Sequence, residues 1–333
     1  MARTGQDTAP RKAIVTNQTI GDALRRAIGY LRSEQLETGE FPSVIADRVD
    51  LGGRHTADSC VFVSTAILHS LRYLGGAALE PMRARTARFL RDEMIEPGIW
   101  RYWTRRSTNT IPADVDDTAC VLAVLQNDLS AQTVAAGRAA IIANRNAQGW
   151  FKTWILPGAA ANDVDSVVNA NVAAYLGPGL ETRQACTRLL DLLLKDRIDG
   201  TYWYYAHDAS LYYALARAAV AFEERATALR ALLRRRLNVP VAGTRSILEV
   251  ALETCTLLTL GIPDSAAVLG RIERILHAQR TNGSWARYGC YAGPVAPAPR
   301  SVWFGSACLT TALCVEALSH TLSSGFWLSR NNT

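Results

Sequence analysis

Residues 279–285 read Gln-Arg-Thr-Asn-Gly-Ser-Trp, and the last part of this stretch, a glycine followed closely by an aromatic residue, recurs along the chain. The shorter copies are Gly39-Glu40-Phe41, Gly98-Ile99-Trp100, Gly149-Trp150 and Gly200-Thr201-Tyr202. Successive glycines are 59, 51, 51 and 83 residues apart, and the last gap has room for a degenerate copy near residues 238–243. A motif that returns at such intervals indicates an internal structural repeat.

Each repeat predicts two helices in different environments. The helix before the turn is amphipathic, as at residues 83–94 and 264–279, and is expected at the surface. The helix after the turn is apolar on nearly every side and is expected to be buried all round. These buried helices are predicted at residues 59–74, 117–125, 164–176, 208–222, 245–260 and 306–318. Six pairs predict an all-α fold, a single (α/α)6 barrel of six inner and six outer helices, with no strands required.

The length and composition of the chain are those of a globular protein. The chain has 333 residues, of which 49% are hydrophobic and 20% charged, as in globular proteins. We expect a flexible N-terminal arm at residues 1–18, the barrel at 19–325 and a C-terminal tail at 326–333. No apolar run reaches the ~20 residues of a membrane span, and the polar N-terminus argues against a secretory signal.

Charge and cysteine usage exclude further classes. The net charge of +6 is too small and too dispersed for a nucleic-acid-binding protein. The seven cysteines include no C-x-x-C pair, and most fall in apolar helical stretches. This pattern favours reduced, buried thiols and a cytoplasmic protein.

Carboxylates gather at the predicted starts of the inner helices. Helices joined by short loops are antiparallel, so the inner helices run parallel and their N-termini meet at one end of the barrel. The residues at these starts are Asp58, Asp114, Asp116, Asp117, Asp163, Asp165, His207 and Asp208. We therefore expect an acidic rim.

The stretch Asp114-Val115-Asp116-Asp117 holds more carboxylates than a helix cap needs. A like-charge pair at 4 Å costs about 4 kcal/mol at an effective dielectric of 20, whereas a helix N-terminus returns about 0.3–1 kcal/mol per acid. At least one of the three is therefore expected to stay protonated near neutral pH, as a general acid does. The alternative is a Mg²⁺ site, to which Asp163 and Asp165 could add oxygen ligands.

Residues 114–119, Asp-Val-Asp-Asp-Thr-Ala, preceded by Pro112-Ala113, resemble the D-x-D-D-T-A signature of the class II terpene cyclase superfamily. This superfamily includes squalene-hopene cyclases and copalyl diphosphate synthases. Residues 279–285 are similar to its Q-x(2–5)-G-x-W repeat, also called the prenyltransferase/squalene cyclase repeat, and residues 35–41 are a weaker copy. The resemblance implies an α/α barrel that cyclises a polyprenyl chain after protonation. Family members usually pair two barrels, and this chain corresponds to the one that carries the catalytic motif.

The resemblance also implies roles for single residues. Asp116 would protonate a terminal alkene or an epoxide, and Asp114 and Asp117 would stabilise the carboxylate left behind. Squalene-type members hydrogen-bond the acid to a histidine, and the similar stretch here offers Asn169 and Asn171 instead. The other residues expected to contact substrate are Trp103, Trp154, Asp165, Tyr204, His207, Trp303 and Phe304, and the aromatic ones would stabilise passing cations.

Basic residues near the rim bear on the substrate. Arg105 and Lys152 lie in predicted rim loops, and such side chains suit phosphate oxygens. They favour a prenyl diphosphate over a hydrocarbon as the isoprenoid substrate, and a single small barrel suggests a C15 or C20 chain. Protonation itself requires no cofactor, and Mg²⁺ would be expected only with a diphosphate.

Three alternatives remain at this point. The barrel could bind a prenyl chain without catalysis, or dock on a partner or a second copy that covers the acidic rim. It could be a glycosidase or lyase with Asp116 and Asp165 as a carboxylate pair, although the apolar inner helices argue against an open polar cleft. A protein prenyltransferase subunit is least favoured, because zinc ligands are lacking. A basic amphipathic helix at residues 230–237 allows peripheral membrane contact.

Overall fold

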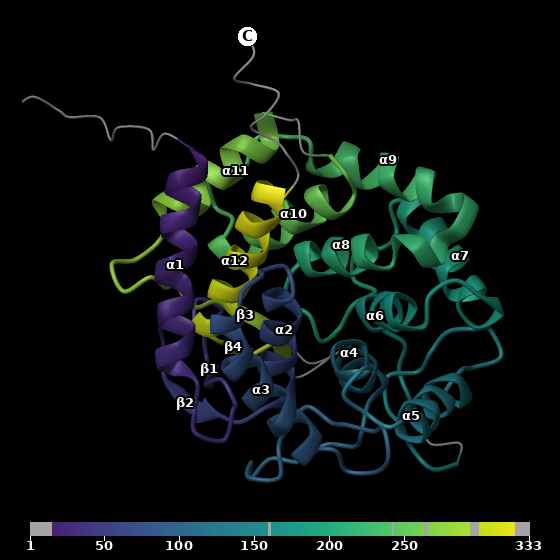
Figure 1. Ribbon diagram of the computed structural model, residues 1–333. Coiled ribbons are helices and arrows are strands. Elements are labelled where there is room, and N and C mark those ends of the chain that lie inside the picture. Colours follow the sequence, from purple (N-terminus) through teal and green to yellow (C-terminus); the bar gives the residue numbers. More distant parts are fainter. Residues whose placement is uncertain (1–14, 159–160, 242, 263–265, 294–299, 324–333) are drawn as a thin grey trace, which may run out of the picture.

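The helices alternate along the chain between a central and a peripheral position (Figure 1). The computed structural model describes residues 15–158, 161–241, 243–262, 266–293 and 300–323. The central helices are α2 (Val61–Leu71), α4 (Val115–Leu125), α6 (Ser166–Leu176), α8 (Asp208–Arg217), α10 (Ile247–Thr259) and α12 (Ala307–Ser323). The peripheral helices are α1 (Asn17–Glu34), α3 (Glu80–Asp92), α5 (Ala131–Ala143), α7 (Leu180–Leu194), α9 (Ala226–Leu237) and α11 (Ala266–His277). Two short 3₁₀ helices, η1 (Ala77–Leu79) and η2 (Ala219–Arg225), lie in connections.

The central helices contact one another in a closed order. α2 packs on α4, α4 on α6, α6 on α8, α8 on α10, α10 on α12, and α12 returns to α2. Most residues of α6, α10 and α12 are buried, as their mainly apolar sequences predict. The predicted helix-rich architecture is therefore confirmed, with each central helix within a few residues of its expected position.

The glycine turns fix the peripheral helices to one another. The side chains of Trp100 and Trp285 are fully buried, and each indole nitrogen donates a 2.7 Å hydrogen bond to a carbonyl ten residues earlier, that of Leu90 or Ile275. Gly283 has a φ of +90°, and a Cβ atom there would lie 2.3 Å from the Arg26 carbonyl oxygen in α1. Only glycine accommodates both the backbone conformation and this close approach.

The same turn joins the two ends of the chain. The Gln279 side chain donates hydrogen bonds to the carbonyl oxygens of Gly283, at 2.9 Å, and of Ala23 in α1, at 2.8 Å. α1 also packs on α12 and α11. α1 begins at Asn17, two residues inside the predicted arm, because Thr16 and Thr19 form a capping box there. Residues 1–14 and the predicted tail at 326–333 lie outside the described residues.

The expectation of a strand-free fold is wrong. A four-stranded antiparallel sheet with the order β2-β1-β4-β3 lies beside the central helices, formed by β1 (Ser43–Ala46), β2 (His55–Asp58), β3 (Gly289–Gly293) and β4 (Val302–Gly305). Strands β1 and β2 precede α2, whereas β3 and β4 precede α12. Each strand has only four or five residues, too few for a clear alternation in the sequence, and the pairing of β1 with β4 joins segments about 260 residues apart.

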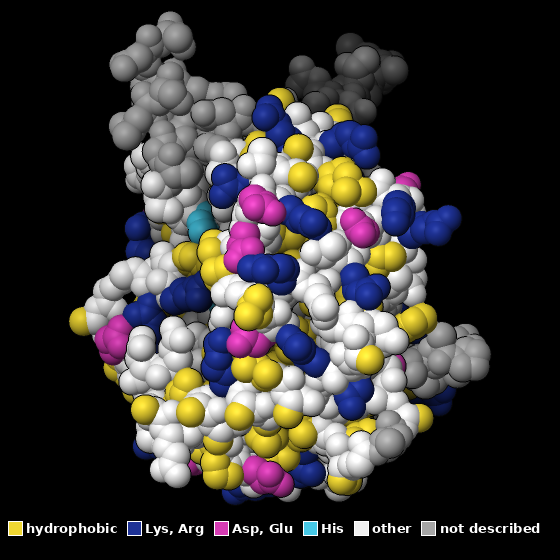
Figure 2. Space-filling view, turned by 90° about the vertical axis from the view of Figure 1, so that its right-hand side faces the viewer, with side chains coloured by type: hydrophobic (Ala, Val, Ile, Leu, Met, Phe, Trp, Pro, Cys, Tyr) yellow, Lys and Arg dark blue, Asp and Glu magenta, His cyan; other side chains and the backbone are white. Residues whose placement is uncertain are grey.

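The peripheral helix α9 has the striped pattern expected of a surface helix. Leu229, Leu233 and Leu237 are buried, whereas Arg230 and Arg234 are exposed. Figure 2 views the molecule from the right-hand side of Figure 1 and shows Lys and Arg side chains spread among acidic and neutral ones. No helix in the described part of the chain has the length and hydropathy needed to cross a bilayer.

Candidate active site

The acidic turn at the start of α4 is held rigidly between two neighbouring loops. Asp114 is the N-cap of α4, and its carboxylate accepts a 2.7 Å hydrogen bond from the Asp117 amide. The amide of Val115 donates to the Thr153 carbonyl at 2.9 Å, and that of Ile155 donates to the Ala113 carbonyl at 2.8 Å. These contacts fix where the next side chain, Asp116, projects.

Asp116 is buried and accepts hydrogen bonds on both carboxyl oxygens. Asn171 in α6 donates to Oδ1 through its Nδ2 atom at 2.7 Å, and the Tyr205 hydroxyl donates to Oδ2 at 2.7 Å. The Tyr291 hydroxyl in β3 donates in turn to the Tyr205 hydroxyl at 3.0 Å. The carboxyl group is thus oriented by neutral donors from three different segments.

Burial raises the pKa of all three carboxyl groups in the turn. For Asp116, desolvation raises the pKa, while the hydrogen bonds from Tyr205 and Asn171 and the charge of Arg217 lower it. Burial, with the negative charge of Asp116, raises the pKa of Asp114 to about 7. Burial and the two neighbouring carboxylates hold the pKa of Asp117 well above its ordinary value. Repulsion between the carboxylates raises the pKa of Asp114 and Asp117, as predicted, but burial is the larger cause of both shifts.

A cavity of about 420 Å³ lies against the acidic turn. Asp114, Asp116 and Asp117 form part of its wall, and Asp163 and Thr153 add further polar groups. The remaining wall is mostly aromatic and apolar, formed by Tyr102, Trp103, Ile111, Trp154, Val168, Tyr204, Tyr291, Ala292, Gly293 and Phe304. Its size falls within the usual range for small-molecule sites, about 300–1,000 Å³.

Polar groups at the edges fix the aromatic rings of this wall. The Asp58 carboxylate in β2 accepts hydrogen bonds from the Tyr102 hydroxyl at 3.2 Å and the Trp103 indole nitrogen at 3.0 Å. The Tyr204 hydroxyl donates to Asp163, and the Tyr204 ring meets that of Trp154 edge-on, with centroids 5.5 Å apart. The rings therefore hold defined positions around the cavity.

Three residues expected in the cavity lie outside its wall. Two of them bind backbone groups, and the third lies on the other face of the sheet. Asn169 hydrogen-bonds the amide and the carbonyl of Phe151, each at 2.9 Å, and so ties α6 to the preceding turn. Asp165 is the N-cap of α6. Trp303 precedes Phe304 in β4, and successive strand side chains point to opposite faces, so Phe304 lines the cavity and Trp303 does not.

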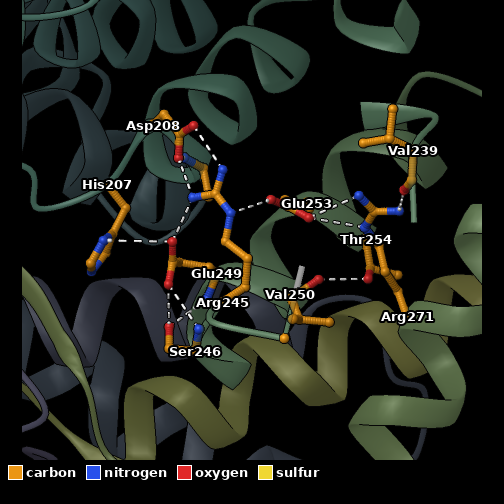
Figure 3. A network of polar contacts seen from close by, with 12 residues as sticks. His207, Asp208, Val239, Arg245, Ser246, Glu249, Val250, Glu253, Thr254 and Arg271 are labelled. Atoms are coloured by element: carbon orange, nitrogen blue, oxygen red, sulfur yellow. Dashed lines mark hydrogen bonds and ion pairs between the residues drawn. The ribbon is translucent and has the colours of Figure 1, made fainter. Parts of the chain in front are cut away.

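The expected polar contacts from His207, Arg105 and Lys152 also lie outside the cavity wall. His207 Nε2 contacts the Gly289 carbonyl at 2.8 Å, and Nδ1 is 3.8 Å from Glu249. Figure 3 shows His207 at the edge of an ionic network in which Arg245 contacts Asp208, Glu249 and Glu253. Arg105 is exposed and contacts Glu93 and the Met94 carbonyl, and Lys152 makes backbone hydrogen bonds to Asn144.

The suggested Mg²⁺ ligands do not fit a metal site. The Asp165 carboxylate accepts hydrogen bonds from four backbone amides, those of Val167, Val168, Trp203 and Tyr204. Its oxygens are therefore satisfied by the protein, whereas Asp163 retains one unpaired buried oxygen, as do Asp114 and Asp117 in the same cavity wall. Within the described ranges, no group of three or more His, Cys, Asp or Glu side chains is arranged to hold a metal ion.

Three residues around Asp116 had no clear signal in the sequence. Tyr291 lies in a five-residue strand that was not predicted. Arg217, in the last turn of α8, donates a hydrogen bond to Oδ1 of Asn171. Tyr205 belongs to the aromatic run at residues 202–205, next to the glycine turn at Gly200, and nothing in the sequence distinguishes it from the other three rings. Each reaches Asp116 only through contacts between distant segments.

Comparison with solved structures finds proteins of the same fold. The type II terpene cyclase MstE from Scytonema superposes with a TM-score of 0.68 at 19% identity, covering 92% of this chain and 99% of MstE. The ent-copalyl diphosphate synthase from Streptomyces platensis gives 0.52 at 20% identity, over 78% of this chain and 50% of the synthase. These structural neighbours support the resemblance to class II terpene cyclases, although identity this low establishes only the fold.

The same fold also occurs in a protein with different chemistry. An unsaturated glucuronyl hydrolase specific for heparin gives a TM-score of 0.59 at 11% identity, over 92% of this chain and 98% of the hydrolase. No protein-family model matches the chain, and no curated protein sequence matches it. The choice among functions therefore depends on the residues of the cavity.

Proposed function

We propose that this protein is a class II terpene cyclase that starts the cyclisation of a linear isoprenoid by protonating it with Asp116. The observation that carries the proposal is the position of this carboxyl group. Asp116 is only 6% exposed, lies in the wall of a cavity with an aromatic lining, and has a raised pKa. The raised pKa favours the protonated form of this acid, which is the form that alkene protonation requires.

The surrounding residues support the later steps. After proton transfer, Tyr205 and Asn171 donate hydrogen bonds that stabilise the Asp116 carboxylate. The positive charge formed on the substrate then migrates as rings close, and aromatic faces stabilise it by roughly 0.5–2 kcal/mol each. Tyr102, Trp103, Trp154, Tyr204, Tyr291 and Phe304 supply such faces. An apolar wall also limits the access of water, which would quench the cation early.

The helix contacts support a two-layer barrel around this chemistry. In the proposed arrangement the closed order of α2, α4, α6, α8, α10 and α12 is an inner ring, and the alternating peripheral helices cover it as in an (α/α)6 barrel. The substrate would enter at the end where the α4 and α6 N-termini lie.

A C15 or C20 prenyl chain is the proposed substrate. The wall of the cavity in the described part of the chain contains four aspartates and no Lys or Arg. A diphosphate group would therefore have to lie outside this wall, and Mg²⁺ would be needed only there. Testing each prenyl chain as the diphosphate and as the free alcohol separates these cases.

The test is turnover by the purified protein and by Asp116→Asn. We expect cyclic products from a farnesyl or geranylgeranyl compound, detected by mass spectrometry, and a loss of at least about 100-fold in kcat for the variant. Circular dichroism checks that the variant is folded. Equal activity of the two proteins would refute the role of Asp116.

Two further outcomes identify the alternatives. Binding of a prenyl alcohol without conversion by the wild-type protein would indicate a non-catalytic prenyl-binding protein, or one that requires a partner over the acidic rim. Hydrolysis of an unsaturated uronide, the kind of reaction implied by the hydrolase of the same fold, would indicate the carboxylate-pair alternative.

A further inference from the structure

A half-buried arginine, Arg217, lies next to the pair formed by Asp116 and Asn171. Asn171 Nδ2 donates to Asp116 at 2.7 Å and to the Tyr205 hydroxyl at 2.9 Å. On its other side, Oδ1 of Asn171 accepts a hydrogen bond from the Arg217 guanidinium. Arg217 is not part of the wall of the 420 Å³ cavity, and its hydrogen bond toward the acid is made to Asn171 rather than to Asp116 itself.

The position of Arg217 is fixed from the opposite side. Its guanidinium lies over the ring of Tyr213, 4.9 Å from the centroid. The Tyr213 hydroxyl donates to the fully buried Glu316 at 2.8 Å, and Ser70 donates to the same carboxylate at 2.8 Å. The guanidinium of Arg217, at the end of α8, is therefore held against a Tyr213 ring that α12 and α2 fix in place through Glu316 and Ser70.

An asparagine amide can present either its NH₂ group or its carbonyl oxygen to a given neighbour. An arginine side chain only donates hydrogen bonds, so it must face the oxygen. With Arg217 in place, the NH₂ group of Asn171 has to point toward Asp116 and Tyr205. In the reverse orientation the amide oxygen would face the carboxyl group, and two donors would face each other.

We propose that Arg217 is a positioning residue that acts through Asn171, by fixing the orientation in which this amide donates to Asp116. This inference rests on the proposed function, because it assigns Asp116 as the acid. It explains how a neutral asparagine, which has two possible orientations, serves as a defined partner for the carboxyl group.

The charge of Arg217 adds a second effect on the same carboxyl group. Neighbouring acidic groups hold the pKa of Arg217 above its ordinary value, so it stays positive, and its charge lowers the pKa of Asp116. The other titratable groups that act on or around Asp116 are Asp114, Asp117, Cys120, Asp165, Tyr205, Cys290 and Tyr291. Removing Arg217 should raise the pKa of Asp116 and move the alkaline limb of the kcat profile to higher pH.

The experiment compares Arg217→Gln with a matched arginine. Arg72 also lies over a tyrosine, 4.8 Å from the ring centroid of Tyr73, but has no contact with Asn171. We expect kcat to fall at least about 10-fold in Arg217→Gln, the equivalent of one lost hydrogen bond to a charged group. KM should change less than about twofold, and Arg72→Gln should retain the wild-type kcat.

A double-mutant cycle with Asn171→Ala tests whether Arg217 acts through the amide. If it does, Arg217→Gln lowers kcat little further once Asn171 is absent. Additive losses would overturn the proposal, because Arg217 would then act without Asn171, and so would an unchanged kcat in Arg217→Gln. Arg217→Lys keeps the charge and a donor, so it should retain more of the wild-type kcat than Arg217→Gln. Arg217→Met, which has no donor, replaces the glutamine variant if that variant does not fold.

A readout without turnover separates this inference from the proposed function. The side-chain ¹⁵N resonances of Asn171, assigned by their loss in Asn171→Ala, should follow the titration of Asp116. Their midpoint should move to higher pH in Arg217→Gln but not in Arg72→Gln. An unchanged midpoint would refute the inference even if the wild-type protein proves to be a cyclase, whereas absent turnover with a shifted midpoint would refute only the proposed function.

Discussion

Asp116 is surrounded by groups that oppose each other in their effect on its proton. Burial favours the protonated form, which the first step needs, whereas the hydrogen bonds from Tyr205 and Asn171 favour the carboxylate, which the first step produces. An acid with no such donors would hold its proton too tightly. The pair of donors offsets part of the effect of burial, so the raised pKa favours the protonated acid while the carboxylate that remains after proton transfer is stabilised.

The charge on Asp114 should make the protein less stable as the pH rises. Its pKa is about 7 in the folded protein and close to 3.9 when unfolded. Between these values the folded state binds more protons than the unfolded state, so the free energy of unfolding falls as the pH increases. Above pH 7 the folded protein bears the full cost of the buried charge.

Asp114→Asn should remove this cost while keeping the helix cap, because asparagine caps as well as aspartate. We expect the variant to be more stable than the wild type by about 1 kcal/mol or more at pH 8, with a smaller difference at pH 5. Urea unfolding at both pH values measures this. Asp128→Asn, at an exposed site, controls for the change in net charge. A difference that does not grow with pH would contradict the prediction.

At the scale of elements, the small sheet decides which aromatic residues reach the cavity. β4 is paired on both sides, with β1 and β3, so its pleat is fixed. Phe304 faces the cavity, and Trp303 lies against Gly289 on the other side. Phe304 and Trp303 are adjacent in the sequence, but only Phe304 can contact a molecule in the cavity.

The two adjacent substitutions should give different defects. Phe304→Ala enlarges the cavity and admits water, so we expect hydroxylated or incompletely cyclised products and a loss of about 10-fold in kcat/KM. Trp303→Ala should leave the product pattern unchanged and lower the free energy of unfolding by about 1–3 kcal/mol. Product analysis by mass spectrometry, with urea unfolding, distinguishes them. The same altered products from both variants would show that the pleat of β4 does not decide which of the two side chains faces the cavity.

At the scale of the whole molecule, the glycine turns bring the last peripheral helix onto the first. Gly283 and Gly200 both have positive φ values, +90° and +77°, but their surroundings differ. A Cβ atom at Gly283 would clash with the Arg26 carbonyl, whereas at Gly200 nothing lies within 4 Å. The contact at Gly283 therefore helps to join the two ends of the chain.

Replacing each glycine by alanine separates backbone strain from this contact. Both variants bear the left-handed conformation, at about 1–2 kcal/mol. Only Gly283→Ala must also push α1 away from the turn, so we expect it to be less stable than Gly200→Ala by at least about 2 kcal/mol. Chemical unfolding of the two variants provides the comparison. Equal losses of unfolding free energy would mean that the turn at Gly283 tolerates a side chain and contributes little to joining the two ends of the chain.

Much of the architecture could be predicted because the burial of a helix is reflected in the residue types of one continuous segment. A helix such as α10 that is buried on every side carries mostly apolar residues on every side, and that pattern is visible in one segment of sequence. The acidic turn was equally visible, because three carboxylates within four residues exceed what a helix cap uses. The short strands have no comparable pattern in their own sequences, because β1 and β4 are stabilised by pairing with each other.

The sequence by itself determined the alternation of buried and surface helices, the positions of the turns, and the acidic residues at the start of α4. Only the tertiary structure decided the partners of Asp116, which come from α6, from the loop before α8 and from β3, and which aromatic rings face the cavity. The physical reason is that helix burial and capping depend on neighbours a few residues away. Hydrogen bonds such as that from Tyr205 to Asp116, between residues 89 positions apart, form only once the chain has folded.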